Sequence, residues 1–173
     1  PFRNLFNDFY ARDTSKKIRA VMRSKGNAGE HLCTNPPYGY MKDPDNPKKH
    51  WIVDDEAAAV VRQIFAWCME GYGPSQIAKK LKDAKVECPT VHWMKLGRNA
   101  PAKTPDDPYG WVPDTVSGIL EKQEYLGHTV NFKTRRLSYK SKKKLETPPN
   151  QWKIFENTHE AIIDKIPLTV CRN

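Results

Sequence analysis

Two clusters of basic residues give this sequence its clearest chemical signal. Arg12–Lys25 contains six Lys and Arg residues against one acid, Asp13, and Lys133–Lys144 contains seven with no acid. Cationic groups at this density neutralise phosphates and release counterions, which is the chemistry of binding a polyanion such as nucleic acid. The alternative is a solvated helix face together with a disordered, solubilising loop. Charge alone does not decide between the two.

Metal chemistry is not indicated by the sequence. The four cysteines, Cys33, Cys68, Cys88 and Cys171, form no CxxC pair, and no two of the five histidines stand at a ligand spacing. Zinc-finger and zinc-ribbon readings therefore fail, and we expect neither a metal nor a cofactor. Scattered cysteines are most simply reduced thiols of a cytoplasmic protein, with a disulfide pair as the alternative.

The composition is that of a polar protein. Its 173 residues include 29 Lys and Arg against 20 Asp and Glu, a formal net charge of +9, and 38% are hydrophobic. This length suffices for one domain with an extension, or for two small domains. No run approaches the roughly 18 apolar residues of a membrane span. Pro1–Tyr10 carries acids and amides where a signal peptide would be basic and then apolar. We therefore expect a cytoplasmic protein without a membrane partner.

The first basic cluster lies on a predicted helix. Asn4–Ser24 has no Gly or Pro, and Gly26 and Gly29 are expected to end the helix. At about 100° per residue, four basic residues fall within an arc of about 60°, with Tyr10 and Val21 nearly opposite. These four are Arg12, Lys16, Arg19 and Arg23. Such a helix can lie on phosphates with one side while its other side packs on protein.

Short elements are expected after an extended linker over Glu30–Pro37. Two aromatic and β-branched runs, Tyr38–Met41 and Trp51–Val53, surround Pro, Asn and Asp residues and predict a β-hairpin. Asp54 or Asp55 then caps a helix whose apolar residues recur at i, i+3, i+4 and i+7. The expected core residues of this helix are Ala57, Val60, Val61, Ile64, Phe65 and Cys68.

Two further helices are predicted. One begins at Gly73-Pro-Ser75 and runs to about Ala84, since proline favours the first helical position. The other spans about Pro113–Lys122, with Val116, Ile119 and Leu120 on its apolar face. The Pro-, Gly- and Asp-rich stretch Lys85–Trp111 between them is expected to be a long loop.

Two strands complete the expected fold. Tyr125–Phe132 alternates like a strand, its residues 127–132 are expected to pair with a second strand over 151–156, and residues 134–150 between them are expected to form a flexible basic loop. We therefore predict an α+β fold, in which a small mixed domain has a winged helix-turn-helix-like three-helix core and short β-hairpins. A long basic helix precedes this domain.

A series of residues makes the sequence recognisable. In order, it comprises Pro36-Pro-Tyr-Gly-Tyr40, Trp51-Ile-Val-Asp54, Glu56-Ala57, Val61-Arg-Gln-Ile-Phe65, Gly71, Ile77-Ala78, Leu81, Trp111, Ile119-Leu120 and Tyr125-Leu-Gly127. Over about residues 30–165 the chain resembles the recombinase domain of the large serine recombinases, the site-specific integrases and transposases of phages and mobile elements. Tyr10-Ala-Arg12 and Ser15-Lys-Lys-Ile-Arg19 are similar to the end of the long helix that leaves the catalytic domain of this family.

The resemblance implies three segments. Residues 1–29 would be the end of the long catalytic-domain helix and the start of the linker, 30–165 the recombinase DNA-binding domain, and 166–173 a tail. In the family the long helix is a dimer contact and crosses the DNA minor groove, so other recombinase protomers are implied partners of the full-length protein.

No active site is expected in this chain. The family's nucleophilic serine belongs to a catalytic domain that this sequence does not include. None of Ser15, Ser24, Ser75, Ser117, Ser138 and Ser141 matches its motif. We expect a non-catalytic, DNA-binding fragment of a recombinase that acts on an attachment site or transposon end. A free-standing winged-helix transcriptional regulator is the alternative. A nuclease is a third reading, although Asp106-Asp107 is the only close acidic pair apart from the helix cap.

We expect double-stranded DNA to contact several surfaces, and for the linker this expectation rests on the resemblance. The stripe of Arg12, Lys16, Arg19 and Arg23 would contact phosphates, and the linker, with Thr34, Tyr38 and Tyr40, would follow the minor groove. The third helix, with Thr115, Ser117, Gly118 and Lys122, is expected in the major groove. The helix from Ser75, with Lys79, is the alternative for that role. Salt-dependent affinity is expected from Lys133, Arg135, Arg136, Lys140, Lys142, Lys143 and Lys144.

Overall fold

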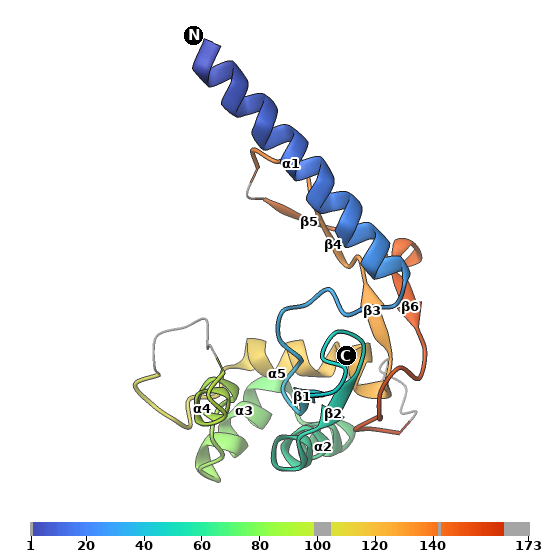
Figure 1. The fold of residues 1–173 in the computed structure, drawn as a ribbon. Helices are drawn as coiled ribbons and strands as arrows, with labels where there is room; N and C mark the ends of the chain where they lie inside the picture. Colours follow the sequence, from blue (N-terminus) through green and yellow to red (C-terminus); the bar gives the residue numbers. More distant parts are fainter. Residues whose placement is uncertain (1, 99–104, 142, 165–173) are drawn as a thin grey trace.

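One long helix, α1 (Phe2–Asn27), rises away from the rest of the molecule (Figure 1). The computed structural model describes residues 2–98, 105–141 and 143–164. The helix predicted over Asn4–Ser24 is confirmed and extends further at both ends. Gly29, in the left-handed region with φ +79°, follows its end, and the backbone N–H of Glu30 still bonds to the carbonyl of Lys25.

The predicted hairpin after the linker is also confirmed. Strands β1 (Tyr40–Lys42) and β2 (Trp51–Val53) are antiparallel, with Tyr40 opposite Val53 and Lys42 opposite Trp51. Tyr40 and Trp51 are buried because one face of the hairpin lies on the hydrophobic core.

Three helices pack together below α1 and form the body of the fold. They are α2 (Asp55–Met69), α3 (Pro74–Asp83) and α5 (Pro113–Leu120). The α2 core prediction is confirmed, since Ala57, Val61, Ile64 and Phe65 are buried and Val60 and Cys68 pack against them. Asp54, and not Asp55, is the N-cap, because its carboxylate accepts a hydrogen bond from the backbone N–H of Ala57.

A fourth helix in the body is a correction to the sequence analysis. α4 (Pro89–Lys95) lies within the stretch Lys85–Trp111 that was expected to be an irregular loop. Pro89 occupies the first helical turn, where its fixed φ suits a helix and its missing N–H is not needed. The indole of Trp111 then ties the returning chain to the carbonyl of Val86 at 3.0 Å.

A small sheet joins the body to the base of α1. After η1 (Gln123–Leu126), β3 (Thr129–Asn131) pairs antiparallel with β6 (Lys153–Phe155), which confirms the predicted pairing. The first part of the expected strand is instead the 3₁₀ turn η1, because Tyr125 is buried in the core and Gly127, with φ +83°, reverses the chain.

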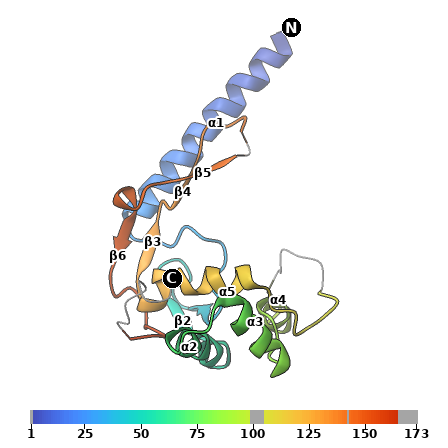
Figure 2. The ribbon, with the colours of Figure 1, turned by 180° about the vertical axis from the view of Figure 1, so that it is seen from behind.

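The basic segment expected to be a flexible loop contains a second strand pair. β4 (Thr134–Arg136) and β5 (Lys144–Glu146) are antiparallel, and η2 (Pro149–Gln151) follows them. We call residues 134–141 and 143–146 the arm. It runs beside α1 in both views (Figures 1 and 2). The α+β fold class is confirmed, whereas the predicted tail 166–173 lies outside the described residues.

Candidate nucleic-acid interface

The basic stripe on α1 is open to solvent. The side chains of Arg12, Lys16, Arg19 and Arg23 are all exposed, and at 1.5 Å per residue they extend over about 16 Å of helix. Arg19 donates a hydrogen bond to the hydroxyl of Ser15 at 3.0 Å. Within the described part of the chain, none of the four forms an ion pair. Their positive charge is therefore available to a phosphate backbone.

Two linker residues predicted to contact DNA are instead in the core, which is a correction. Tyr38 is 5% exposed and Tyr40 is fully buried. The hydroxyl of Tyr40 donates to the carbonyl of Glu160 at 2.8 Å, and the carbonyl of Tyr38 accepts from the hydroxyl of Tyr125 at 2.8 Å. Burial raises the pKa of both hydroxyls, those of Tyr38 and Tyr40. Aromatic rings in a linker fill a core as readily as a groove when their polar ends find backbone partners.

Gly39, between the two tyrosines, lets the linker enter the core. Its φ is +99°, and a Cβ there would lie 2.9 Å from the side chain of Ile162 and 3.2 Å from that of Val61. Only glycine fits this position without strain. Thr34, the third linker candidate, is exposed and lies outside the core.

Helix α5 presents small residues on its free side. Val116, Ile119 and Leu120 are buried, whereas Thr115, Ser117 and Gly118 are half-buried. A Cβ on Gly118 would meet only the ammonium of Lys122, at 3.9 Å. In both ribbon views α5 lies on the side of the body from which α1 rises, and the linker runs between them (Figures 1 and 2). Lys79, on the neighbouring α3, is exposed.

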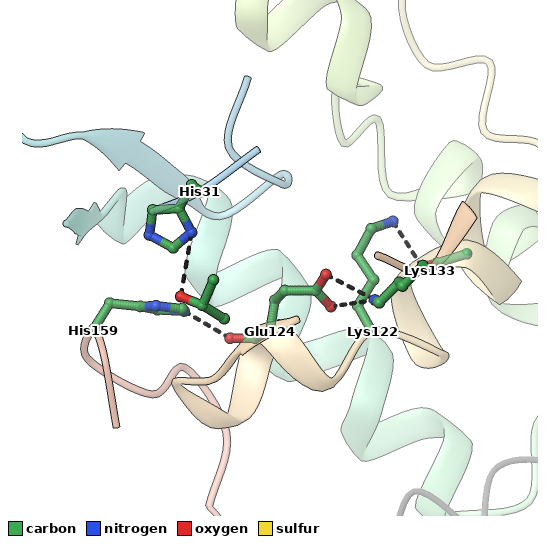
Figure 3. A network of polar contacts seen from close by, with 7 residues as sticks. His31, Lys122, Glu124, Lys133 and His159 are labelled. Carbon is green, nitrogen blue, oxygen red and sulfur yellow. Dashed lines mark hydrogen bonds and ion pairs between the residues drawn. The ribbon is translucent and has the colours of Figure 1, made fainter. Parts of the chain in front are cut away.

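Two predicted DNA-binding lysines have partners inside the protein (Figure 3). The ammonium of Lys133 lies 2.8 and 3.0 Å from the two carboxylate oxygens of Glu124, and that of Lys122 donates to the carbonyl of Gly118 at 2.8 Å. Burial lowers the pKa of Lys122, a shift that Glu124 opposes. Lys122 thus bonds back onto the end of α5, and Lys133, just before β4, is tied to η1, so both offer less charge to DNA than the α1 stripe does.

The basic side chains of the arm are of two kinds, one paired with a carboxylate of the protein and the others exposed to solvent. The ammonium of Lys140 lies 2.9 Å from the carboxylate of Asp8 on α1. The remaining arm cations are exposed, namely Arg135, Arg136, Lys143 and Lys144. Lys142 lies outside the described residues. Three of these exposed cations are on the two strands, and Lys143 immediately precedes β5.

A histidine on the linker packs against the body. The imidazole of His31 stacks on the indole of Trp51 at 3.7 Å, and its Nδ1 lies 3.3 Å from the hydroxyl of Thr129. Burial, reinforced by His159 and His50, lowers the pKa of His31 to about 4. Nε2 of His159 donates to the carbonyl of Glu124 at 2.9 Å (Figure 3). The neutral imidazole of His31 therefore holds the linker against Trp51.

Sequence reasoning missed three residues that position these surfaces. Asp8 and Glu124 hold lysines of the basic segment, and the amide of the buried Asn131 donates to the carbonyls of Gly26 and Glu30 at 3.1 and 2.9 Å. For Asn131 a signal existed, because Thr129 and Asn131 place two polar side chains on one face of a predicted strand. The partners of Asp8 are more than 130 residues away in sequence, and although Lys133 is only nine residues from Glu124, no helix or strand period relates the two.

Metal binding and membrane insertion find no support in the described residues. There, no group of three or more His, Cys, Asp or Glu side chains is placed to hold a metal ion. Within the same ranges, no helix is both long and apolar enough to cross a membrane. Cys33 and Cys88 are free thiols, and Cys171 lies beyond the described residues.

Comparison with known proteins gives one match. The model of the family described as Recombinase matches residues 55–166, more than half of the chain, from the first residue of α2 to beyond β6. No curated protein and no solved structure matches. The chain therefore belongs to the Recombinase family, and the match is consistent with the recombinase domain of the large serine recombinases that its sequence resembles.

Proposed function

We propose that the chain binds double-stranded DNA as the recombinase domain of a large serine site-specific recombinase, at an attachment site or a transposon end. The observation that carries the proposal is the order of its surfaces. α1, which carries the exposed stripe, the linker and α5 follow one another on one side of the molecule (Figures 1 and 2). A duplex tracked along this side would meet all three.

Each surface would have a separate role. The α1 stripe would neutralise phosphates and fix the register without reading sequence. The linker around Thr34 would follow the minor groove, where short arms sense width and A·T content. Thr115 and Ser117 of α5, beside the open position Gly118, would reach base edges in the major groove. The α3–α5 pair would then act as a helix-turn-helix with α4 inserted in its turn.

The proposal also covers the parts of a larger recombinase. Residues 1–29 would be the end of the long helix that connects to a catalytic domain carrying the nucleophilic serine. Strand exchange would be catalysed there, with other protomers assembled on paired sites. Residues 30–165 would recognise the target DNA sequence.

Selection from random duplexes tests this function and identifies the target sequence in the same experiment. The 173-residue chain would be bound to a random-sequence duplex library, and enriched duplexes compared with scrambled ones by fluorescence anisotropy across a salt series. We expect an enriched sequence that binds at least about 10³-fold more tightly than its scrambled form, as specific DNA-binding proteins do.

Two outcomes would count against the proposal. Equal, purely salt-driven binding to both duplexes would mean that the basic surfaces supply all the affinity and that base reading by α5 is wrong. Absence of binding at low salt would remove the DNA assignment. Where specific binding is found, alanine at Thr115 and Ser117 should each relax selection at one or two base pairs, by about 1–3 kcal/mol.

A further inference from the structure

The base of α1 is fixed tightly to the end of β3 and to the linker. Asn131, at the end of β3, bonds through its amide to the carbonyls of Gly26 and Glu30. The next residue, Phe132, places its ring so close to Gly26 that a Cβ there would overlap it, and Leu32 Cδ1 would be only 2.9 Å away. Phe132 holds a φ of +64°, which is unusual for an aromatic residue. This is the lower attachment of the helix.

A second attachment lies far along the helix, at the tip of the arm. One carboxylate oxygen of Asp8, Oδ1, accepts from the hydroxyl of Tyr139 at 2.7 Å and lies 2.9 Å from the ammonium of Lys140. Both contacts favour the ionised carboxylate, and they lower the pKa of Asp8. These residues are separated by more than 130 positions in the chain.

The two attachments are on one face of α1. Asp8 and Gly26 are 18 residues apart, which is about five full turns and about 27 Å along the axis. The arm spans this interval beside the helix (Figures 1 and 2). A rod attached only at its base can swing about that point, whereas a second contact so far along the rod sets its direction.

We propose that the arm is a strut that sets the direction in which α1 leaves the body, with Asp8 as its anchor on the helix. The strut would hold the α1 stripe at a fixed distance from α5, so that both match one duplex. The inference goes beyond the proposed function, because it concerns the chain without DNA and is tested without DNA.

A distance measurement between α1 and the body tests the strut. Ketone-bearing p-acetylphenylalanine would replace the exposed Tyr10 on α1 and the exposed Gln63 on α2, and both would be labelled with nitroxides. This chemistry leaves the natural cysteines untouched. Double electron–electron resonance then reports the distribution of distances between the helix and the body. We expect one narrow distribution for the parent chain.

The decisive variant is Asp8→Ala, with Asp13→Ala as its matched control. Both remove an acid of α1 that forms an ion pair, but Asp13 pairs with Lys17 inside the helix, at 2.9 Å, whereas Asp8 pairs with the arm. We expect Asp8→Ala to raise the ratio of displaced to docked helices roughly fivefold, the effect of losing an exposed, charge-assisted contact. Asp13→Ala should leave the distribution unchanged.

A charge-swapped double variant separates the loss of the Asp8–Lys140 contact from other effects of Asp8→Ala. The pair Asp8→Lys with Lys140→Glu restores opposite charges and should narrow the distribution again. Circular dichroism of each variant reports whether α1 itself stays helical. A broad distribution in the parent, or one that Asp8→Ala leaves as narrow as before, would overturn the strut and would leave the DNA-binding proposal intact.

Discussion

Nε2 of His92 lies 2.7 Å from Oδ2 of Asp54, and both side chains are buried. The other carboxylate oxygen of Asp54 caps α2. The carboxylate of Asp54 therefore caps α2 and also holds α4, because its second oxygen contacts His92, a residue of α4 that follows 38 positions later in the chain. This pair explains how a seven-residue helix, too short to persist alone, is held on the body.

Removing the carboxylate of Asp54 should destabilise the fold by more than the loss of a helix cap alone would. Asp54→Ala loses the cap, about 1 kcal/mol, and leaves buried His92 without its acceptor, about 1–3 kcal/mol. We expect a total loss of about 3 kcal/mol in the free energy of unfolding, measured with urea. Asp55→Ala, an exposed change one residue away, is the control and should cost less than about 1 kcal/mol. Equal losses for the two variants would show that the His92 contact contributes nothing.

The linker histidine should make stability depend on pH. In the unfolded chain the pKa of His31 is about 6.5, whereas in the folded chain it is about 4. The unfolded state therefore binds more protons between these values, so stability is complete above about pH 6.5 and falls as the pH falls toward about 4. We expect the melting temperature of the parent chain to decrease between about pH 7 and about pH 5.

A variant isolates the contribution of His31. His31→Phe keeps a ring on Trp51 but removes the titrating group, so its melting temperature should change less over the same window. Thr34→Ala, at an exposed linker residue without a titrating side chain, is the control and should retain the parent's pH dependence. If His31→Phe melts with the same pH dependence as the parent, other groups are responsible.

Sequence reasoning succeeded where the determinants are local. The periodic apolar residues of α2, the proline at the start of α3 and the two runs around Asp43–Pro47 determine their elements because each depends on neighbours in the chain. α4 was missed although Pro89 carries the same helix-start signal as Pro74. The loop-like composition around Pro89 masks that signal, and the contact that holds α4 in place comes from Asp54, far away in sequence.

The candidate site was less predictable, because its side-chain environments depend on distant partners. Tyr40 is buried since its hydroxyl reaches Glu160, 120 residues away, and nothing near Tyr40 distinguishes a core ring from a groove-binding one. In the same way, the basic side chains of residues 133–144 look equivalent in sequence. The structure separates Lys133 and Lys140, which have carboxylate partners, from the exposed arginines.

The α1 stripe should determine much of the salt dependence of DNA binding. Each phosphate neutralised contributes about 0.9 to the slope of log K against log salt concentration. The double substitution Arg12→Ala and Lys16→Ala should therefore reduce the slope by about 1.8 and weaken binding to selected and scrambled duplexes alike.

A matched double variant controls for net charge. Lys17→Ala with Lys25→Ala removes the same charge from the same helix, but these side chains project more than about 90° from the centre of the stripe. Fluorescence anisotropy in a salt series should give this variant nearly the parent's slope. Identical slopes for the two double variants would mean that α1 acts through its total charge and not through one face.

Gly118 offers a test that separates folding from recognition on α5. It lies inside the helix with open space where a side chain would project. Gly118→Ala should therefore stabilise the fold by about 0.5–1 kcal/mol, because glycine has the larger backbone entropy to lose.

Gly118→Leu should fold as well, yet it should weaken specific binding at least about tenfold if this surface approaches base edges within van der Waals contact. Ala59→Leu, on the exposed side of α2, is the control and should leave DNA affinity unchanged. Unfolding in urea and anisotropy on the selected duplex give the two readouts from the same preparations. If Gly118→Leu binds as tightly as the parent, α5 is not the inserted helix, and α3 with Lys79 takes that role.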